Sequence, residues 1–116
     1  MRSFFHLLLT CIVLSGCVAS SITPTGSEPR QPASDPNSIV IFYQEGDVGK
    51  PFKTLGLINY KNPGKYQILT LEKTIPQLKQ QASTVGANGI IIDRQYAIRS
   101  GIISTGIGVE ARAIRF

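Results

Sequence analysis

The apolar positions after residue 37 follow two kinds of pattern, and the first kind predicts strands. SIVIFY (38–43) is a continuous apolar and β-branched run, which is typical of a central strand covered on both faces. FKTLGLINY (52–60) predicts a second strand, and KNPG (61–64) predicts the turn that follows it.

The second predicted strand has a glycine at its centre. Period-two alternation places Leu55 and Leu57 opposite to Ile58 and Tyr60. Gly56 has no side chain to pack, and a glycine inside a strand is typical of a β-bulge or of a close approach between two backbones. We therefore expect an irregularity in this strand.

The last third of the chain predicts two more strands. Residues 90–96, which begin with three isoleucines after a glycine, predict the third strand, and Ser100-Gly101 is typical of a turn. The closing segment, 102–116, alternates apolar and charged residues with a period of two, which predicts a half-buried strand. The alternating residues are Val109, Ala111 and Ala113 on one side and Glu110 and Arg112 on the other.

The second kind of pattern, a spacing of three and four, predicts one helix. Thr74 is a candidate N-cap with Gln77 three residues on, and Pro76 suits a first turn. Gly86 is typical of the residue that ends a helix. The apolar stripe consists of Ile75, Leu78, Ala82 and Val85. Residues 65–73 fit a strand or a helix. The prediction is a small α+β domain of order β-β-α-β-β, with a mainly antiparallel sheet and one packed helix.

The N-terminus has the pattern of a secretory signal. Arg2 precedes an apolar run, FFHLLLTCIVL, which is shorter than the roughly 20 residues that a membrane-spanning helix needs. The run ends in a segment that resembles the lipobox of bacterial lipoproteins: Leu14, Ser15, Gly16 and Cys17. The resemblance implies that residues 1–16 are a cleaved signal peptide, recognised at the first three of these residues, and that the Cys17 sulfur carries lipid. The alternatives are an ordinary signal peptide with a stray cysteine and a buried hydrophobic strand.

The segment after this cysteine predicts a tether. Ten of the twenty residues from Val18 to Asn37 are Ser, Thr or Pro. Such a composition buries too little apolar surface to offset its ordering entropy, so we expect 17–37 to be a disordered tether and 38–116 to be the globular domain. Because Val18, rather than an aspartate, follows Cys17, the resemblance implies an outer-membrane address facing the periplasm.

The composition of the processed chain excludes much chemistry. Cleavage before Cys17 would remove His6, the sole histidine, together with Cys11, and it would lower the formal charge from +5 by the one charge of Arg2. Zinc and copper sites draw chiefly on Cys and His, and Ser-His-Asp and Cys-His arrangements need a histidine. We expect no metal site, no cofactor, no disulfide and no enzymatic activity, and the sequence carries no nucleic-acid-binding module.

Three segments resemble a known group of domains. They are KPFKTLGLI (50–58), GANGIIID (86–93) and EARAIRF (110–116). They look like the small envelope lipoproteins with YbjQ-like domains, and like the lipoprotein sensor of Rcs envelope stress. The resemblance implies a comparable fold, and it leaves homo-oligomerisation open because YbjQ-like domains assemble as oligomers.

The lysines are segregated along the chain. All six lie between Lys50 and Lys79, where Glu72 is the one acidic residue, so this stretch carries six minus one, or five, net positive charges. Such a run is either a solvated surface or a docking surface for an anionic partner, with these candidate residues: Lys50, Lys53, Lys61 and Lys65. We expect a non-catalytic outer-membrane lipoprotein whose domain binds an envelope protein or an anionic envelope polymer, as an accessory of a secretion or stress-sensing complex. The alternative is a periplasmic ligand-binding or sensor module.

The first testable prediction concerns processing. Mass spectrometry of the membrane-extracted protein is expected to show an acylated N-terminal Cys17, and Cys17→Ser is expected to block maturation because the lipid acceptor is lost. A water-soluble mature form that begins at another residue would contradict the lipoprotein interpretation.

Overall fold

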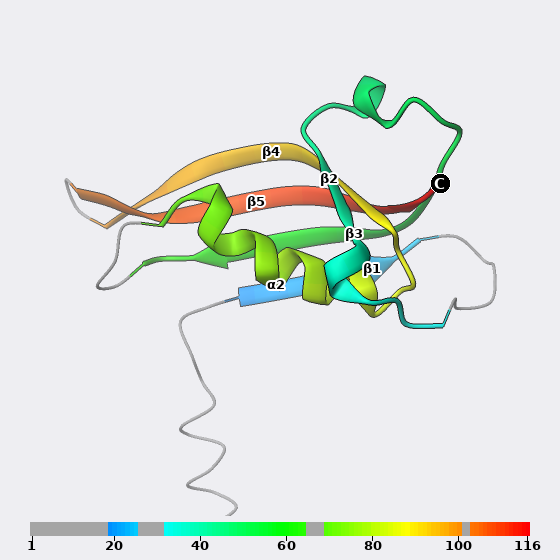
Figure 1. The fold of residues 1–116 in the computed structure, drawn as a ribbon. Helices are drawn as coiled ribbons and strands as arrows, with labels where there is room; N and C mark the ends of the chain where they lie inside the picture. Colours follow the sequence, from blue (N-terminus) through cyan, green and yellow to red (C-terminus); the bar gives the residue numbers. More distant parts are fainter. Residues whose placement is uncertain (1–18, 26–31, 65–68, 101–102) are drawn as a thin grey trace, which may run out of the picture.

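A five-stranded sheet with one α-helix on it makes up the fold (Figure 1). The computed structural model describes residues 19–25, 32–64, 69–100 and 103–116. The elements are β1 (Ala19–Pro24), β2 (Val40–Phe42), β3 (Lys53–Asn62), α2 (Leu71–Ser83), β4 (Gly89–Ser100) and β5 (Ile103–Arg115), with short 3-10 helices η1 (Pro36–Ser38) and η2 (Glu45–Val48). The strands lie in the order β1-β3-β5-β4-β2, and all neighbours are antiparallel except β2 and β4. The predicted α+β class, with a mainly antiparallel sheet and one helix, is confirmed.

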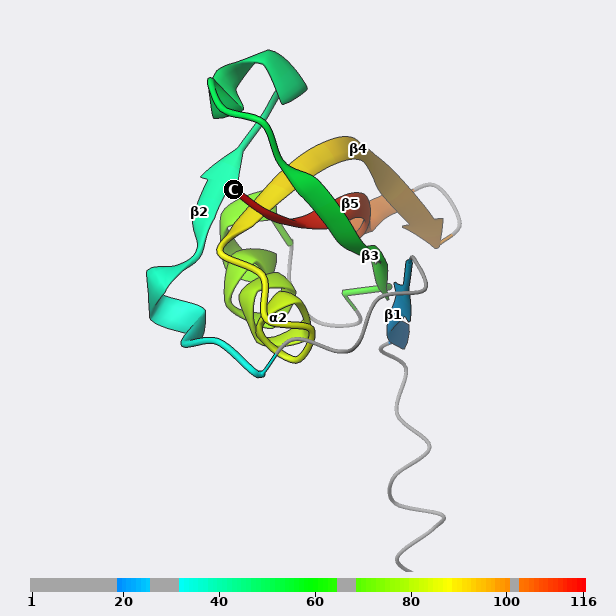
Figure 2. The ribbon, with the colours of Figure 1, turned by 90° about the vertical axis from the view of Figure 1, so that its right-hand side faces the viewer.

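The main core lies between α2 and one face of the sheet, as the end-on view shows (Figure 2). Leu78 and Ala82 of the helix are fully buried against β4 and β5. The predicted alternation of the closing strand is confirmed, because its apolar residues are buried in this core: Val109, Ala111 and Ala113. Its charged residues Glu110 and Arg112 consequently point to the opposite face.

The prediction of a disordered tether over 17–37 is wrong for the residues of β1. Ala19–Pro24 pairs antiparallel with β3, from Ala19 opposite Lys61 to Pro24 opposite Gly56. An edge strand gains its partners through its backbone, so a Ser- and Thr-rich segment can join a sheet with few apolar side chains. Its one large apolar residue, Ile22, packs against the core. A side chain on Gly56 would come within 3.0 Å of Ile22, so the glycine makes room for it.

The segment 32–37, also assigned to the tether, contacts the domain as well. Ser34 donates from its backbone N–H to the Ser83 carbonyl at 2.9 Å and from its hydroxyl to the Ala87 carbonyl at 2.6 Å. Residues 26–31 lie outside the described part of the chain. Since β1 precedes the predicted strands, the order of the elements is β-β-β-α-β-β rather than β-β-α-β-β.

The prediction of a central strand at 38–43 is also wrong. β2 is a three-residue strand at the edge of the sheet, parallel to the first residues of β4. Val40 and Tyr43 are 46% and 58% exposed, so the run is not covered on both faces. A continuous apolar run does not distinguish an edge from a centre when part of it packs at the end of the core, as Ile39 does.

The helix begins earlier than its capping pattern predicts. Thr70 is the residue before the helix, and Thr74 is buried inside it, where its hydroxyl donates to the Leu71 carbonyl at 2.7 Å. Pro76 therefore lies in the second turn. Gly86 has a φ of 78°, which confirms it as the residue that ends this segment.

The expected irregularity of β3 is a bulge, and it changes which face Leu55 occupies. The register with β5 shifts between Thr54 and Gly56. Leu55 consequently packs against the same core as Ile58, whereas Leu57 faces away from that core. The prediction that Leu55 and Leu57 share a face is wrong because the extra residue of a bulge interrupts the period of two.

The second face of the sheet is covered at one end. Val48, at the end of η2, packs with Ile91 and Ile114, and this small cluster is extended by three aromatic residues, Phe42, Phe52 and Phe116. The rings of Phe42 and Phe116 meet edge to face with centroids 5.6 Å apart. The remainder of this face, toward the β4–β5 hairpin, is not covered by α2 or by this cluster.

The second testable prediction uses a glycine at a close approach of two backbones. A Cβ on Gly106 would lie 2.6 Å from the Asn62 carbonyl oxygen and 2.8 Å from the Pro63 Cα. Gly106→Ala is therefore expected to lower the free energy of unfolding by about 1–3 kcal/mol. Gly46→Ala is the matched control, because a Cβ there meets nothing within 4 Å. Equal thermal midpoints for the two variants in circular dichroism would contradict the β3–β5 geometry.

Candidate interaction surface

Six side chains of β3, β4 and β5 lie together in the uncovered part of the second sheet face. We call this surface the open face, and its residues are Leu57, Asn59, Arg94, Tyr96, Glu110 and Arg112. The register makes them cross-strand neighbours: Leu57 is paired with Arg112, and Glu110 is paired with both Asn59 and Arg94. The antiparallel pairing therefore brings distant parts of the sequence into one surface, because Leu57 and Arg112 are 55 positions apart in the chain.

Arg94 connects two neighbours on the open face. Its guanidinium lies 3.6 Å from the Glu110 carboxylate and 4.8 Å from the centroid of the Tyr96 ring. The Arg94 and Glu110 side chains are 62% and 46% exposed. Exposed pairs of this kind contribute roughly 0.2–1 kcal/mol each, so they orient the side chains more than they stabilise the fold.

Arg112 joins the open face to the loop that carries η2. It donates to Asp93 through two nitrogens, each 2.9 Å from a carboxylate oxygen, and to Glu45 at 3.2 Å. These hydrogen bonds, those accepted by Asp93 foremost, raise the pKa of Arg112 above its ordinary value. A two-pronged pair with a carboxylate fixes the guanidinium plane, so this cation is held in one orientation.

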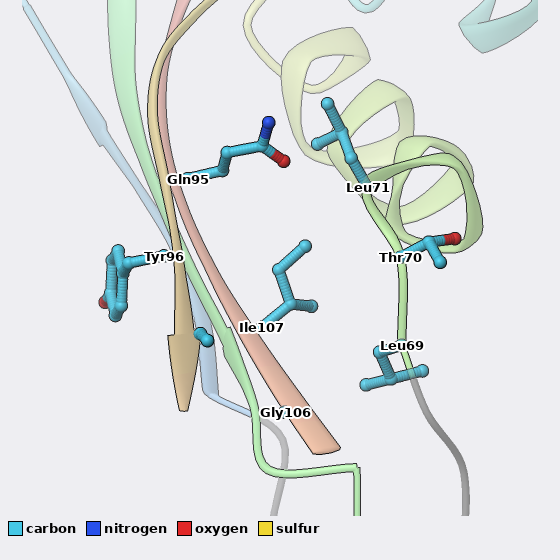
Figure 3. Close-up of a pocket in the computed structure, with 8 residues that line it drawn as sticks. Leu69, Thr70, Leu71, Gln95, Tyr96, Gly106 and Ile107 are labelled. Atoms are coloured by element: carbon cyan, nitrogen blue, oxygen red, sulfur yellow. The ribbon is translucent and has the colours of Figure 1, made fainter. Parts of the chain in front are cut away.

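Tyr96 covers a glycine of the neighbouring strand. Gly108 is its cross-strand partner, and a side chain on Gly108 would occupy the position of the Tyr96 ring. Figure 3 shows Tyr96 on the opposite side of the sheet from Gln95 and Ile107, which point toward α2. An aromatic ring over a strand glycine lies flat along the sheet, and the Arg94 guanidinium lies over the other side of this ring.

Leu57 is the apolar residue of the open face. It is 48% exposed, although it lies in the middle of β3 between two paired strands. Thr23 of β1 is its neighbour on one side and Arg112 its neighbour on the other. The open face thus has a single half-exposed leucine with polar and charged neighbours.

A pocket lies on the other side of the sheet, at the start of the helix. Its cavity volume is about 390 Å³. It lies between the segment at the start of α2 and the halves of β4 and β5 nearest their hairpin (Figure 3). Its lining contains leucine, isoleucine, alanine and neutral polar residues but no carboxylate, ammonium or guanidinium group: Leu69, Thr70, Leu71, Gln95, Tyr96, Ala97, Gly106 and Ile107. Such a lining suits a small neutral or apolar molecule more than acid–base chemistry.

The structure does not bring the candidate lysines together. Lys53 and Lys61 lie eight residues apart on β3, which at about 3.3 Å per residue is roughly 26 Å. Lys50 lies before the strand, with its ammonium 5.7 Å from the centroid of the Phe116 ring. Lys65 lies outside the described residues. The three candidate lysines that the structure describes therefore belong to two ends of the sheet and form no compact patch.

The lipobox residues Leu14, Ser15, Gly16 and Cys17 also lie outside the described residues. Within the part of the chain that is described, no helix combines the length and the apolar character needed to span a bilayer. The same residues contain no cluster of three or more His, Cys, Asp or Glu side chains that would hold a metal ion.

Sequence reasoning did not find the open face. The alternation around Glu110 and Arg112 correctly marked them as outward-facing, but alternation does not say which other strands lie beside them. Arg94 and Tyr96 share this face because the register of β4 shifts between Ile92 and Arg94. No signal in the sequence marks that shift.

Comparison with known proteins defines the fold class. No family model matches the chain, and no curated protein matches its sequence. Among solved structures, the crystal structure of the Francisella virulence factor FvfA is similar to this chain, with a TM-score of 0.59, 13% sequence identity, and 83% of this chain and 96% of that chain covered. At that identity the likeness shows a shared fold and nothing further.

Proposed function

We propose that this protein is a non-catalytic outer-membrane lipoprotein whose domain binds a periplasmic protein through the open face. The observation that carries the proposal is the exposure of Leu57, an aliphatic side chain that is 48% exposed in the centre of a sheet. Its neighbour Arg112 is fixed in place by its ion pair with Asp93. Charged residues around an apolar centre favour a specific partner, because a mismatched partner would bury their charges unpaired.

The lipid anchor of the proposal rests on the sequence. The lipobox-like segment ending at Cys17 follows an apolar run of signal-peptide length, and Val18 supports the outer-membrane address. The resemblance to YbjQ-like envelope domains supports the same setting. An accessory role in a secretion or stress-sensing complex fits a small domain that offers a surface.

The pocket beside α2 supports the second candidate function, a periplasmic ligand-binding module. Its volume of about 390 Å³ lies within the usual range for ligand sites, and Gln95 and Thr70 supply polar groups. The protein-binding role ranks first because the open face has an ordered set of charged groups, whereas no side chain that points into the pocket is ionisable.

The third testable prediction places a charge at the centre of the open face. Leu57→Asp is expected to remove the partner from affinity captures of the full-length protein, because a buried unpaired carboxylate in an interface is costly. Val40→Asp is the matched control, since Val40 is a strand residue 46% exposed but lies on β2, away from the open face.

Circular dichroism of both variants checks that the fold is retained. Recovery of the same proteins, in the same amounts, with wild type, Leu57→Asp and Val40→Asp would contradict the assigned surface. Loss of a partner with both variants would also contradict it, because the effect would then not be specific to the open face.

A further inference from the structure

We propose that the end of the sheet nearest the β4–β5 hairpin rests against anionic phospholipid headgroups of the bilayer in which Cys17 is anchored. We call this the hairpin end; its residues are Lys61 of β3 and Ile98 and Arg99 of β4. The inference rests on the proposed lipidation of Cys17 and is independent of the partner proposed for the open face.

The first argument is the length of chain between lipid and sheet. Ala19 is the first residue of β1, and it lies two residues after Cys17. Two residues span at most about 7 Å, so the lipidated sulfur has little freedom to move away from the sheet. Because β1 is paired with β3, the distance of the domain from the membrane is set by these two residues and not by the 21 residues from 17 to 37.

The second argument is how far the hairpin reaches. Ala19 pairs with Lys61, Lys61 with Gly108, and Gly108 with Tyr96, so these four residues share one row across the sheet. β4 continues from Tyr96 to Ser100, four residues or about 13 Å beyond that row. This is about twice the reach of the link to Cys17. Figure 1 shows β4 and β5 extending past the start of β1 in this direction.

With the strands directed toward the bilayer, the hairpin end reaches the membrane surface when the lipid chains are inserted. A bilayer that accepts the acyl chains at Cys17 meets the end of β4 at the level of its headgroups. An orientation with the β1 edge turned to the bilayer would lift the hairpin from the headgroups, so the charge of the hairpin end has to select the upright orientation. The domain therefore stands on this end, with Phe116 and η2 at the far end of the sheet.

The third argument is charge. Lys61 and Arg99 are both exposed, and neither makes an ion pair with an acidic side chain in the described part of the chain. In the first turn of α2, at the same end, Glu72 and Lys73 balance each other. The carboxylates of Glu45, Asp47 and Asp93 lie elsewhere, in η2 or beside Arg112. The hairpin end thus presents positive charge to anionic phosphates, and each basic residue near such a surface strengthens docking about fivefold.

The same orientation keeps the open face accessible. The face runs along the strands, so when the sheet stands on its hairpin end, Leu57 and Arg112 lie above the headgroups and not against them. Membrane contact and partner binding then use different parts of one sheet.

The fourth testable prediction uses a fluorophore on an introduced cysteine. Cys11 lies in the signal segment and the Cys17 sulfur would be acylated, so a new thiol is the sole labelling site of the mature protein. Ala97→Cys places the probe one residue past the Tyr96 row, and Gly46→Cys places it at the exposed η2 loop. The full-length lipidated protein is reconstituted into vesicles of phosphatidylethanolamine and phosphatidylglycerol that contain a headgroup-attached quencher.

The fluorescence of the probe at residue 97 is expected to be quenched, and the fluorescence of the probe at residue 46 is expected to stay unquenched. Lys61→Glu with Arg99→Glu is expected to lower the ratio of docked to undocked protein by at least about fivefold for each residue, and high salt is expected to act in the same direction. Lys53→Glu is the matched control on the same strand, because it places a carboxylate opposite Arg115 at the other end.

The outcomes separate the two proposals. Protein that lacks the acyl chains, or that is not recovered with the vesicles, would contradict the lipoprotein assignment. Acylated protein that is recovered with the vesicles but is quenched equally at residues 97 and 46 would overturn the docking alone. Quenching at residue 97 that Lys61→Glu with Arg99→Glu leaves unchanged would overturn the headgroup contact.

Discussion

The pairing of β5 with strands on both of its sides is the constraint on which the rest of the structure depends. β5 is the central strand, and its register with β3 and β4 assigns Val109, Ala111 and Ala113 to the helix side and Glu110 and Arg112 to the open face. A slip of one residue would exchange these two sets, burying the charges and exposing the core. The register of β5 therefore determines both the core and the candidate interaction surface.

The edges of the sheet follow from this centre. β3 pairs with β5 on one side and leaves its other backbone edge to β1, a strand whose side chains add little beyond Ile22. This arrangement joins the segment after Cys17 to the domain through backbone hydrogen bonds. A lipid on that cysteine would then anchor a sheet directly, whereas a disordered linker would let the domain move freely above the membrane.

The features that sequence patterning predicted are those decided locally. The half-buried closing strand, the bulge at Gly56 and the glycine at the end of the helix segment each depend on a few neighbouring residues, and the structure confirms them. Ala19–Pro24 lacked a strand pattern because its pairing depends on the free edge of β3, which no local pattern records. SIVIFY was placed at the centre of the sheet because burial at the end of a core and burial between two strands give the same apolar run. The open face needed the register of three strands, including a shift in β4 that carries no sequence signal.

The central claim is that the residues directly after Cys17 belong to the sheet. Hydrogen–deuterium exchange on the full-length protein tests it most directly, because the exchange of residues 19–24 can be followed in peptides that contain no other strand. The account predicts that the β1 amides that face β3 exchange more slowly than the amides of an unstructured chain, and that Gly56→Val, which crowds Ile22, removes this protection. Free exchange throughout Ala19–Pro24 in the wild-type protein would contradict it, and the domain would then be attached by a flexible tether.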